Sequence, residues 1–402
     1  MRIAFVNPNT HSRYPQPPLG LLTIATICQS HGHYVWIVDA NARKLSDKKV
    51  IEAIDLADAV GVTAMSLNYP EALRLSKYIR RLFPFRYMVL GGVHATLCPD
   101  AVISEGVFDA VVMGEGEMMG PLALGQKTKG IIQVEHTVNL DEIPVLDYSL
   151  LGKHLMAKAP YGKHRAFVPI LASRGCPFSC SFCSKAVFGN KYRVKSIPRV
   201  MSELYRLIEL GVKDVKFYDD VFTLDKNRAI EMSQHINSRV AWSCMTRVNR
   251  VDRKVLRYMK AGGCHTVSYG IESGDQDILS SISKNATLEQ AEQAVKYSKE
   301  AGLKVIGYFM LGAPGETLET IEKTIDFAIS SGVDYAQFSI ATALPGSELY
   351  ELVPEDKRAN AYLMDGVTNP SLCALNPVQL QDALKRANKR FKKGEKKQQV
   401  LI

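Results

Sequence analysis

The chain has 402 residues, of which 46% are hydrophobic and 23% charged, and its formal net charge is +9. This composition is that of a soluble globular protein with two or three domains, and it excludes a disordered or fibrous chain. No apolar stretch reaches the length of a membrane span, and the eight cysteines favour metal or redox use in a cytoplasmic protein over a disulfide framework.

Predicted strands and helices alternate over residues 1–140. The opening residues, 2–7, are a short apolar run without a small-residue cleavage site behind it, so they predict a buried strand rather than a signal peptide. Alternating strands and helices predict a doubly wound parallel sheet, with its ligand at the carboxyl ends of the strands. The expected strands cover residues 2–7, 34–39, 59–65, 87–90 and 110–113, and the expected helices cover 19–31, 50–56 and 70–82.

A second series of strands and helices is predicted over residues 166–345, after a linker at 141–165. Six such units favour a partial (β/α)6 barrel over a closed eight-stranded one, and catalytic groups in such folds lie where strands end. Residues 346–402 are predicted to be a small helical C-terminal region. The expected barrel strands cover residues 167–172, 214–218, 241–246, 266–271, 304–309 and 335–340.

Three cysteines, Cys176, Cys180 and Cys183, follow the first barrel strand with the spacing C-x3-C-x2-C, and Phe182 stands between the last two. Thiolates select iron–sulfur clusters, zinc or copper(I), and a closed zinc or four-iron site needs four protein ligands. Three cysteines leave one iron of a four-iron cluster open for a substrate or cosubstrate, which is a catalytic arrangement. A disulfide with one spare thiol, or a zinc site completed by a distant residue, is the alternative.

Positive charge is concentrated near the C-terminus. Residues 383–402 hold eight Lys or Arg against the single acid Glu395, a net charge of +7. A solvated helix end and a docking surface for an acidic macromolecule are both compatible with this segment. A nucleic acid is the least expected partner, because aromatic residues do not alternate with the charges.

Residues 166–345 resemble the radical S-adenosylmethionine (SAM) superfamily. The cysteine loop carries the resemblance, and YDD at 218–220, TR at 246–247, GIESG at 270–274 and GYFMLGAPGE at 307–316 follow at successive strand ends. In that superfamily, the amino and carboxylate groups of SAM chelate the open iron of a [4Fe–4S] cluster. The resemblance implies that Cys176, Cys180 and Cys183 bind the cluster and that SAM contacts Phe182, Asp219, Asp220, Arg247, Glu272, Gly312 and Leu344.

The chemistry of these residue types suits SAM. Asp219 or Asp220 can accept hydrogen bonds from the amino group, and Arg247 can fork onto the carboxylate. Glu272 can bind a ribose hydroxyl, and Gly312 allows close backbone approach to the adenosine. Pairing of Arg247 with Glu272, and capping of the next helix by Asp219, are the structural alternatives.

Residues 1–140 resemble the cobalamin-binding domain fused to one branch of that superfamily. Residues 60–65 are similar to the strand and loop that face the corrin, and 25 residues separate Met65 from Gly91, close to the spacing of the glycines that admit the nucleotide tail. The resemblance implies that cobalamin contacts Leu19, Thr63, Met65, Ser66, Leu67, Asn68, Tyr69, Gly91, Gly92, Gly114, Glu115, Gly116 and Glu117.

The sequence after the first strand departs from one known pattern for the lower ligand of cobalt. Domains that ligate cobalt through histidine carry D-x-H-x-x-G after the first strand, where this chain has the sequence NTHSRY at 9–14. His11 is therefore expected to be a loop residue, with cobalt ligation as the alternative. Residues 65–69 are then expected to lie under the cobalt, and a weak or absent lower ligand favours methyl transfer by radical recombination.

The resemblance implies a C-methyltransferase in which a 5′-deoxyadenosyl radical abstracts hydrogen from an unactivated carbon and methylcobalamin supplies the methyl group. It implies an external electron donor and a cytoplasmic, anaerobic or low-oxygen setting. The short C-terminal region favours an open site and a peptide or protein substrate docked by the basic tail, as in the similar enzymes that C-methylate methyl-coenzyme M reductase at glutamine. Cyclisation or ring rearrangement without methyl transfer, a small-molecule substrate, loss of cobalamin and a non-catalytic sensor are the alternatives.

Overall fold

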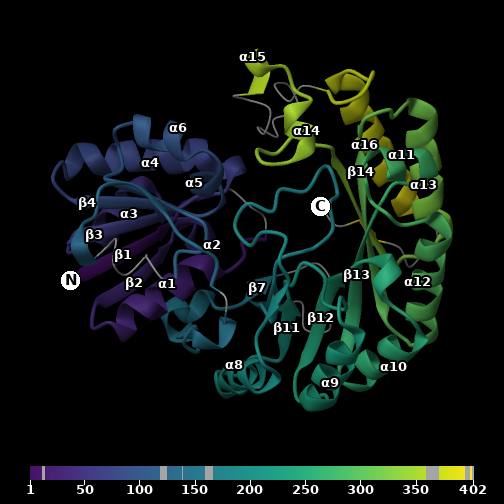
Figure 1. Ribbon diagram of the computed structural model, residues 1–402, viewed down its shortest axis with the longest axis horizontal. Helices are drawn as coiled ribbons and strands as arrows, with labels where there is room; N and C mark the ends of the chain where they lie inside the picture. Colours follow the sequence, from purple (N-terminus) through teal and green to yellow (C-terminus); the bar gives the residue numbers. More distant parts are fainter. Residues whose placement is uncertain are drawn as a thin grey trace. The chain divides into compact units, whose positions relative to one another are not determined.

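The computed structural model (Figure 1) describes residues 1–10, 14–117, 125–137, 139–158, 166–358, 371–393 and 399–400. The chain forms two compact units. The first takes the described residues of 1–159, 166–169 and 185–212, and the second takes those of 170–184 and 213–402. His11 and the basic residues Lys396 and Lys397 lie outside the described residues.

The first unit is built on a six-stranded parallel sheet with the order β2-β1-β3-β4-β5-β6. The order reverses between β1 and β3, and such a switch point is where doubly wound sheets bind ligands. The strands are β1 (Arg2–Asn7), β2 (Tyr34–Asp39), β3 (Ala59–Thr63), β4 (Tyr87–Gly91), β5 (Ala110–Met113) and β6 (Gly130–Gln133). The helices between them are α1 (Leu19–Ser30), α2 (Ala40–Arg43), α3 (Asp47–Ile54), α4 (Tyr69–Leu82), α5 (Val93–Leu97) and α6 (Pro99–Ser104).

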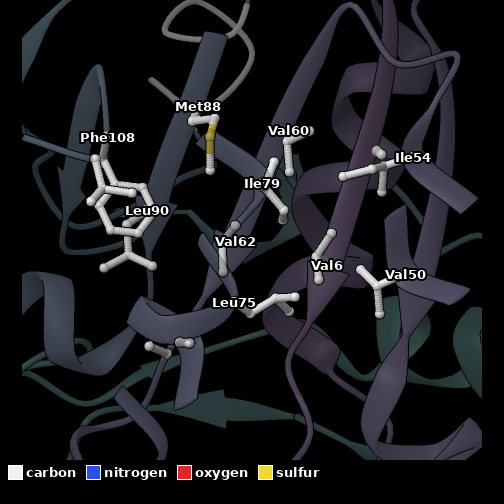
Figure 2. Close-up of a cluster of buried hydrophobic side chains, with 14 of the residues drawn as sticks. Val6, Val50, Ile54, Val60, Val62, Leu75, Ile79, Met88, Leu90 and Phe108 are labelled. Atoms are coloured by element: carbon white, nitrogen blue, oxygen red, sulfur yellow. The ribbon is translucent and has the colours of Figure 1, made fainter. Parts of the chain in front are cut away.

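Both faces of this sheet are buried, as the continuous apolar runs of its strands require. On one face Val60 and Val62 pack with residues of α3 and α4 such as Ile54 and Ile79, as Figure 2 shows. On the other face Phe5 and its neighbours pack against α1. The doubly wound sheet predicted from the sequence is therefore confirmed.

The second unit carries parallel strands in the order β15-β14-β13-β12-β11, with β16 beside β15. The same sheet continues beyond β11 with β8, whose residues 166–169 are counted in the first unit. Helices follow most of the strands, so the predicted partial barrel is also confirmed (Figure 1). The strands are β8 (Ala166–Ile170), β11 (Asp214–Phe217), β12 (Ala241–Thr246), β13 (Cys264–Glu272), β14 (Lys304–Leu311), β15 (Tyr335–Ile340) and β16 (Gln399–Val400). The helices are α9 (Lys226–Ile236), α10 (Arg253–Ala261), α11 (Gln276–Ser281), α12 (Leu288–Glu300), α13 (Leu318–Ser330), α14 (Glu348–Glu351), α15 (Glu355–Arg358) and α16 (Pro377–Lys393).

Helix α16 belongs to the barrel rather than to a free tail. Its buried residues include Leu380 and Phe391, and the Phe391 ring meets Phe338 of β15 edge-on with centroids 6.1 Å apart. Arg386 donates to Glu322 of α13 at 2.9 Å, and Arg390 pairs with both Glu322 and Asp326 of that helix. Two of the eight basic residues of the C-terminal segment thus stabilise the fold, while Lys385, Lys389, Lys392 and Lys393 are exposed.

The division of the chain differs from the predicted domain boundaries. Part of the expected linker forms two 3-10 helices, Leu140–Glu142 and Tyr148–His154, in the first unit. Residues 185–212, which include β10 (Arg193–Val194) and α8 (Ile197–Glu209), also belong to that unit although they follow the cysteine loop. Polar contacts join this segment to the first unit: Arg193 pairs with Glu115, the Ser196 N–H donates to Asp141, and Arg199 donates to the Ile143 carbonyl.

Candidate active site

The backbone holds the cysteine loop of the second unit in place. The Ser181 N–H donates to the Ile282 carbonyl at 3.0 Å, and the Ser181 carbonyl accepts from the Leu349 N–H at 3.1 Å. Cys180 is buried, Cys176 is half-buried and Cys183 is exposed. Ser181, which directly follows the second cysteine, therefore fixes the loop through both its N–H and its carbonyl group.

Asp219, which follows β11, binds the two residues that lead into this loop. Its carboxylate is buried and accepts from the Ala172 N–H at 2.8 Å and from the Ser173 hydroxyl at 2.5 Å. The cap of α9 is Asp225, so the alternative that Asp219 caps that helix is wrong. Asp220 is exposed. The structure thus gives Asp219 a supporting role in the loop, which the sequence did not reveal.

Arg247 reaches the cysteine loop from the end of β12. Its Nη1 lies 3.1 Å from the Cys180 sulfur, and its guanidinium carbon lies 4.0 Å from the centroid of the Phe178 ring. Its Nη2 donates to the Lys284 carbonyl. Its Nε is buried and has no hydrogen-bond partner among the described residues. A cation with donors beside the second cysteine suits a carboxylate bound at the open iron.

Glu272 pairs with a residue that the sequence analysis did not single out. Its Oε1 lies 2.7 Å from Lys284 Nζ, where the Lys284 side chain is 6% and the Glu272 side chain 13% exposed, so the alternative of an Arg247–Glu272 pair is wrong. A Cβ at Gly270 would overlap the Glu272 carboxylate and stand 2.9 Å from Lys284 Nζ, which explains that glycine. No local motif marks Lys284 as functional, because its partner lies 12 residues earlier on another element.

The loop after β14 contains Gly312 and Glu316. Gly312 has φ +89°, and a Cβ there would stand 3.0 Å from a methyl of Leu380 in α16. The Glu316 carboxyl accepts from the Gly312 and Ala313 N–H groups, and burial raises its pKa to about 7. Leu344 closes a turn by accepting from the Ser347 N–H at 3.0 Å.

In the first unit, two glycines shape the carboxyl end of β3 and β4. Gly92 has φ +95°, and a Cβ there would stand 2.7 Å from Thr63 Oγ1 and 2.9 Å from the Ala64 carbonyl. The Ala64 N–H donates to the Gly91 carbonyl at 3.2 Å. This crowding and the left-handed backbone favour glycine at position 92, where the chain lies directly against the loop after β3.

The loop after β3 alternates exposed apolar and buried polar side chains. Met65 and Leu67 are 52% and 44% exposed, whereas Ser66 and Asn68 are buried. The Met65 N–H donates to Asn68 Oδ1 at 2.7 Å, which fixes the turn. Two exposed apolar side chains at a ligand-binding strand end suit the apolar face of a corrin ring.

A histidine that the sequence analysis missed supports this loop. His94 is buried, stacks on Tyr69 with ring centroids 3.9 Å apart, and places Nδ1 3.2 Å from Ser66 Oγ. Burial lowers the pKa of His94 to about 4, so the imidazole is neutral at pH 7. In the sequence, the feature that could have marked His94 as part of the site is its position two residues after Gly92.

The acidic glycine turn after β5 contributes mainly to packing. Glu115 forms a fully buried ion pair with Arg193 and lies 3.1 Å from His136 Nδ1. Gly114 has φ +83°, and its N–H donates to Thr96 Oγ1 at 2.9 Å. The remaining predicted cobalamin residues of this region are Gly116, whose Cβ position faces Ile24 of α1, the buried Glu117, and the half-buried Leu19.

Over the described residues, no three His, Cys, Asp or Glu side chains converge on a single metal ion. None of the helices in the described ranges is long and apolar enough to span a membrane. The cysteine loop with Arg247 fits a cluster and SAM, and the Gly92 cradle with Met65 and Leu67 fits cobalamin.

Comparison with known proteins agrees with these two sites. Residues 170–328 match the radical SAM superfamily, and residues 9–122 match the B12 binding domain. An uncharacterized methyltransferase of Pyrococcus horikoshii is 38% identical over 389 residues, which cover 87% of this chain and 83% of that protein. The chain therefore belongs to the radical SAM superfamily and, within it, to the cobalamin-dependent methyltransferases.

Two further relatives widen the comparison. The anaerobic magnesium-protoporphyrin IX monomethyl ester cyclase of Rubrivivax gelatinosus is 29% identical, over 87% of this chain and 70% of that protein. The radical SAM methyltransferase TsrM of Kitasatospora setae, solved with cobalamin and a [4Fe–4S] cluster, shares the fold with a TM-score of 0.71 and 19% identity, over 87% of this chain and 75% of that one. The two family matches and the Pyrococcus horikoshii relative confirm the predicted enzyme class and the cofactor set of [4Fe–4S] cluster, SAM and cobalamin.

Proposed function

We propose that this enzyme methylates an unactivated carbon of a peptide or protein residue. The observation that supports the proposal is the position of Arg247, which contacts the Cys180 sulfur and the Lys284 carbonyl, because a cation with donors beside the second cysteine suits the carboxylate of a cosubstrate on the cluster. When bound, the cluster and SAM supply a 5′-deoxyadenosyl radical, and cobalamin supplies the methyl group.

The roles proposed for the residues of the second unit follow from their surroundings. Cys176, Cys180 and Cys183 hold the cluster, Arg247 binds the SAM carboxylate, and Glu272 binds a ribose hydroxyl. Further proposed SAM contacts are Phe182, Asp219, Asp220, Gly312 and Leu344. Phe182 packs against an apolar cluster that includes Met310 and Ala341, so it offers the adenosine a firm apolar wall.

In the first unit, all proposed cobalamin contacts except Leu19, which begins α1, follow or end the strands β3, β4 and β5. Met65 and Leu67 present apolar surface to the corrin, and Ser66, supported by His94, is the nearest polar group of that loop. Gly92 keeps the path of the nucleotide tail open. The full proposed set is Leu19, Thr63, Met65, Ser66, Leu67, Asn68, Tyr69, Gly91, Gly92, Gly114, Glu115, Gly116 and Glu117.

The proposed substrate class rests on the positive charge of helix α16. Four exposed lysines of α16, at 385, 389, 392 and 393, suit the docking of an acidic partner, although Lys385 also pairs with Asp382 at 3.4 Å. A small-molecule substrate is the second candidate, favoured by relatives named for a magnesium-protoporphyrin ester and for cytidylyl-2-hydroxyethylphosphonate. An external one-electron donor is required in either case.

The test is anaerobic turnover of the reconstituted enzyme with methyl-labelled SAM, a chemical reductant, and either an acidic peptide library or a metabolite extract. Labelled methyl groups in peptides, together with 5′-deoxyadenosine, would support the proposal. Label only in small molecules would support the second candidate. Formation of 5′-deoxyadenosine with a product that carries no label would overturn methyl transfer. Cys180→Ala should abolish 5′-deoxyadenosine, and Cys373→Ala, which lies outside the loop, should not.

A further inference from the structure

The segment from Ile282 to Asn285 connects three parts of the proposed SAM site. The Ile282 carbonyl accepts from Ser181 of the cysteine loop at 3.0 Å. The Lys284 carbonyl accepts from Arg247, and the Lys284 ammonium pairs with Glu272 at 2.7 Å. One short stretch of chain therefore contacts the cluster loop, the proposed carboxylate-binding residue and the proposed ribose-binding residue.

The backbone of this segment is held in an unusual conformation. Ser283 and Asn285 both have φ of +51°, in the left-handed region that residues with side chains seldom occupy. The Asn285 carbonyl accepts from Asn249 Nδ2 at 2.8 Å, and the Lys284 N–H donates to the Leu279 carbonyl at 3.0 Å. Tertiary contacts thus fix the position of Lys284 independently of its side chain.

The Lys284 side chain is buried and faces the SAM site on two sides. Only 6% of its side chain is exposed, and its ammonium lies 5.5 Å from the centroid of the Phe182 ring. Glu272, its partner, also has a left-handed backbone, with φ +72°. Since the ammonium and the carboxylate hold each other in one geometry, loss of the ammonium would leave the Glu272 carboxylate, whose side chain is only 13% exposed, without its counter-charge.

From this geometry we infer that Lys284 is a positioning residue for SAM, which acts by fixing the Glu272 carboxylate for the ribose. The inference rests on the proposed role of Glu272 in SAM binding. Arg247 contacts the backbone carbonyl of Lys284, so substitution of the side chain leaves that contact intact. A variant at position 284 therefore tests the ion pair with Glu272 without removing the contact of Arg247.

The experiment measures SAM affinity on anaerobically reconstituted enzyme by equilibrium dialysis, together with KM and kcat for SAM cleavage. Lys284→Met should weaken SAM binding by about tenfold, equivalent to about 1.4 kcal/mol, and should raise KM more than it lowers kcat. The iron content and the spectrum of the cluster without SAM should be unchanged. Lys284→Arg, which keeps the charge, should recover part of the lost affinity.

A second buried pair provides a matched control. Lys195 and Glu203 in the first unit are also 2.7 Å apart, with side chains 6% and 1% exposed, and Arg199 lies 3.9 Å from the same carboxylate. Lys195→Met should cost similar stability and leave the affinity for SAM unchanged. If Lys195→Met weakens SAM binding as much as Lys284→Met does, the effect is one of general stability and the inference fails.

A double-mutant cycle separates this inference from the proposed function. If Lys284 acts through Glu272, adding Lys284→Met to Glu272→Gln should cause no further loss of SAM affinity. A further loss equal to that of the single variant would overturn the inference, while wild-type SAM cleavage would still support the proposed function. Absence of SAM cleavage by the wild-type enzyme would instead overturn the proposed function.

Discussion

The carboxylate of Glu115 and the guanidinium of Arg193 form an ion pair in which both side chains are buried, 78 positions apart in the chain. Arg193 also donates to the carbonyls of Thr137 at 2.5 Å and Phe188 at 3.0 Å. One guanidinium thus joins the turn after β5, the segment after β6 and the segment that follows the cysteine loop.

Removal of Arg193 should destabilise the first unit strongly. Breaking a buried pair by removing one partner leaves an uncompensated charge and costs about 3–5 kcal/mol. Arg193→Met should lower the free energy of unfolding by that amount, and Glu115→Gln in the same chain should restore part of it. The chain has two tryptophans, so unfolding of the first unit can be followed by Trp36 fluorescence in a Trp242→Phe background.

The control for this prediction is the exposed pair of Lys49 and Glu52, whose side chains are 64% and 46% exposed at 2.8 Å. Lys49→Met should change the free energy of unfolding by less than about 1 kcal/mol. Equal effects of Arg193→Met and Lys49→Met would contradict the assigned role of the buried pair.

Gly92→Ala should reduce cobalamin binding. The added methyl group would meet Thr63 and the Ala64 carbonyl, so the loop that carries Met65 must shift. We expect at least a tenfold loss of affinity in an absorbance titration of the apoprotein with cobalamin. Gly32 has a similar φ of +82° but open space around its Cβ position, so Gly32→Ala measures the backbone cost alone. Retained affinity in Gly92→Ala would show that this glycine does not shape the cobalamin site.

Arg247 should raise the reduction potential of the cluster. A positive charge and an N–H donor beside a cysteine sulfur stabilise the more negative, reduced state. Arg247→Met should therefore shift the midpoint potential to a more negative value in an anaerobic spectroscopic titration without SAM. Arg253 also stacks on an aromatic ring, 4.2 Å from the centroid of Tyr297, but in an exposed position away from the cysteines. Arg253→Met should leave the potential unchanged, and a shift of the same size in both variants would refute a specific effect.

Glu316 should make the second unit less stable as pH rises towards neutrality. Burial raises the pKa of this carboxyl from 4.5 to about 7, so the folded protein binds the proton more tightly than the unfolded chain does. The resulting stabilisation is complete below pH 4.5, is lost as pH rises through about 7, and amounts to about 3 kcal/mol at most.

The pH dependence can be measured as the free energy of unfolding at pH 5 and pH 8, followed by Trp242 fluorescence in a Trp36→Phe background. The decrease from pH 5 to pH 8 should be smaller in Glu316→Gln than in the wild type. Glu319, whose side chain is 81% exposed, supplies the control, because Glu319→Gln should keep the wild-type decrease. An unchanged decrease in Glu316→Gln would refute the elevated pKa.

Local features of the sequence predicted the fold and the main ligands. The barrel strands are apolar runs of a few residues, and the cysteines lie on one loop, so both can be identified without tertiary information. Lys284 and His94 escaped prediction because their partners, Glu272 and Ser66, come from other elements and no local motif specifies the contact. The second role of Glu115 depends on a residue 78 positions later, which no window on the sequence can reveal.

Residues 185–212 belong to the first unit, and this limits where the enzyme can be joined to a relative in a chimaera. A chimaera joined once, between residues 140 and 166, would take the turn of Glu115 from one parent and its guanidinium from the other. Exchange of the whole cobalamin module therefore needs a second junction, near residue 212. Among relatives, we expect residues 185–212 to be inherited together with the part of the first unit that precedes the cysteine loop.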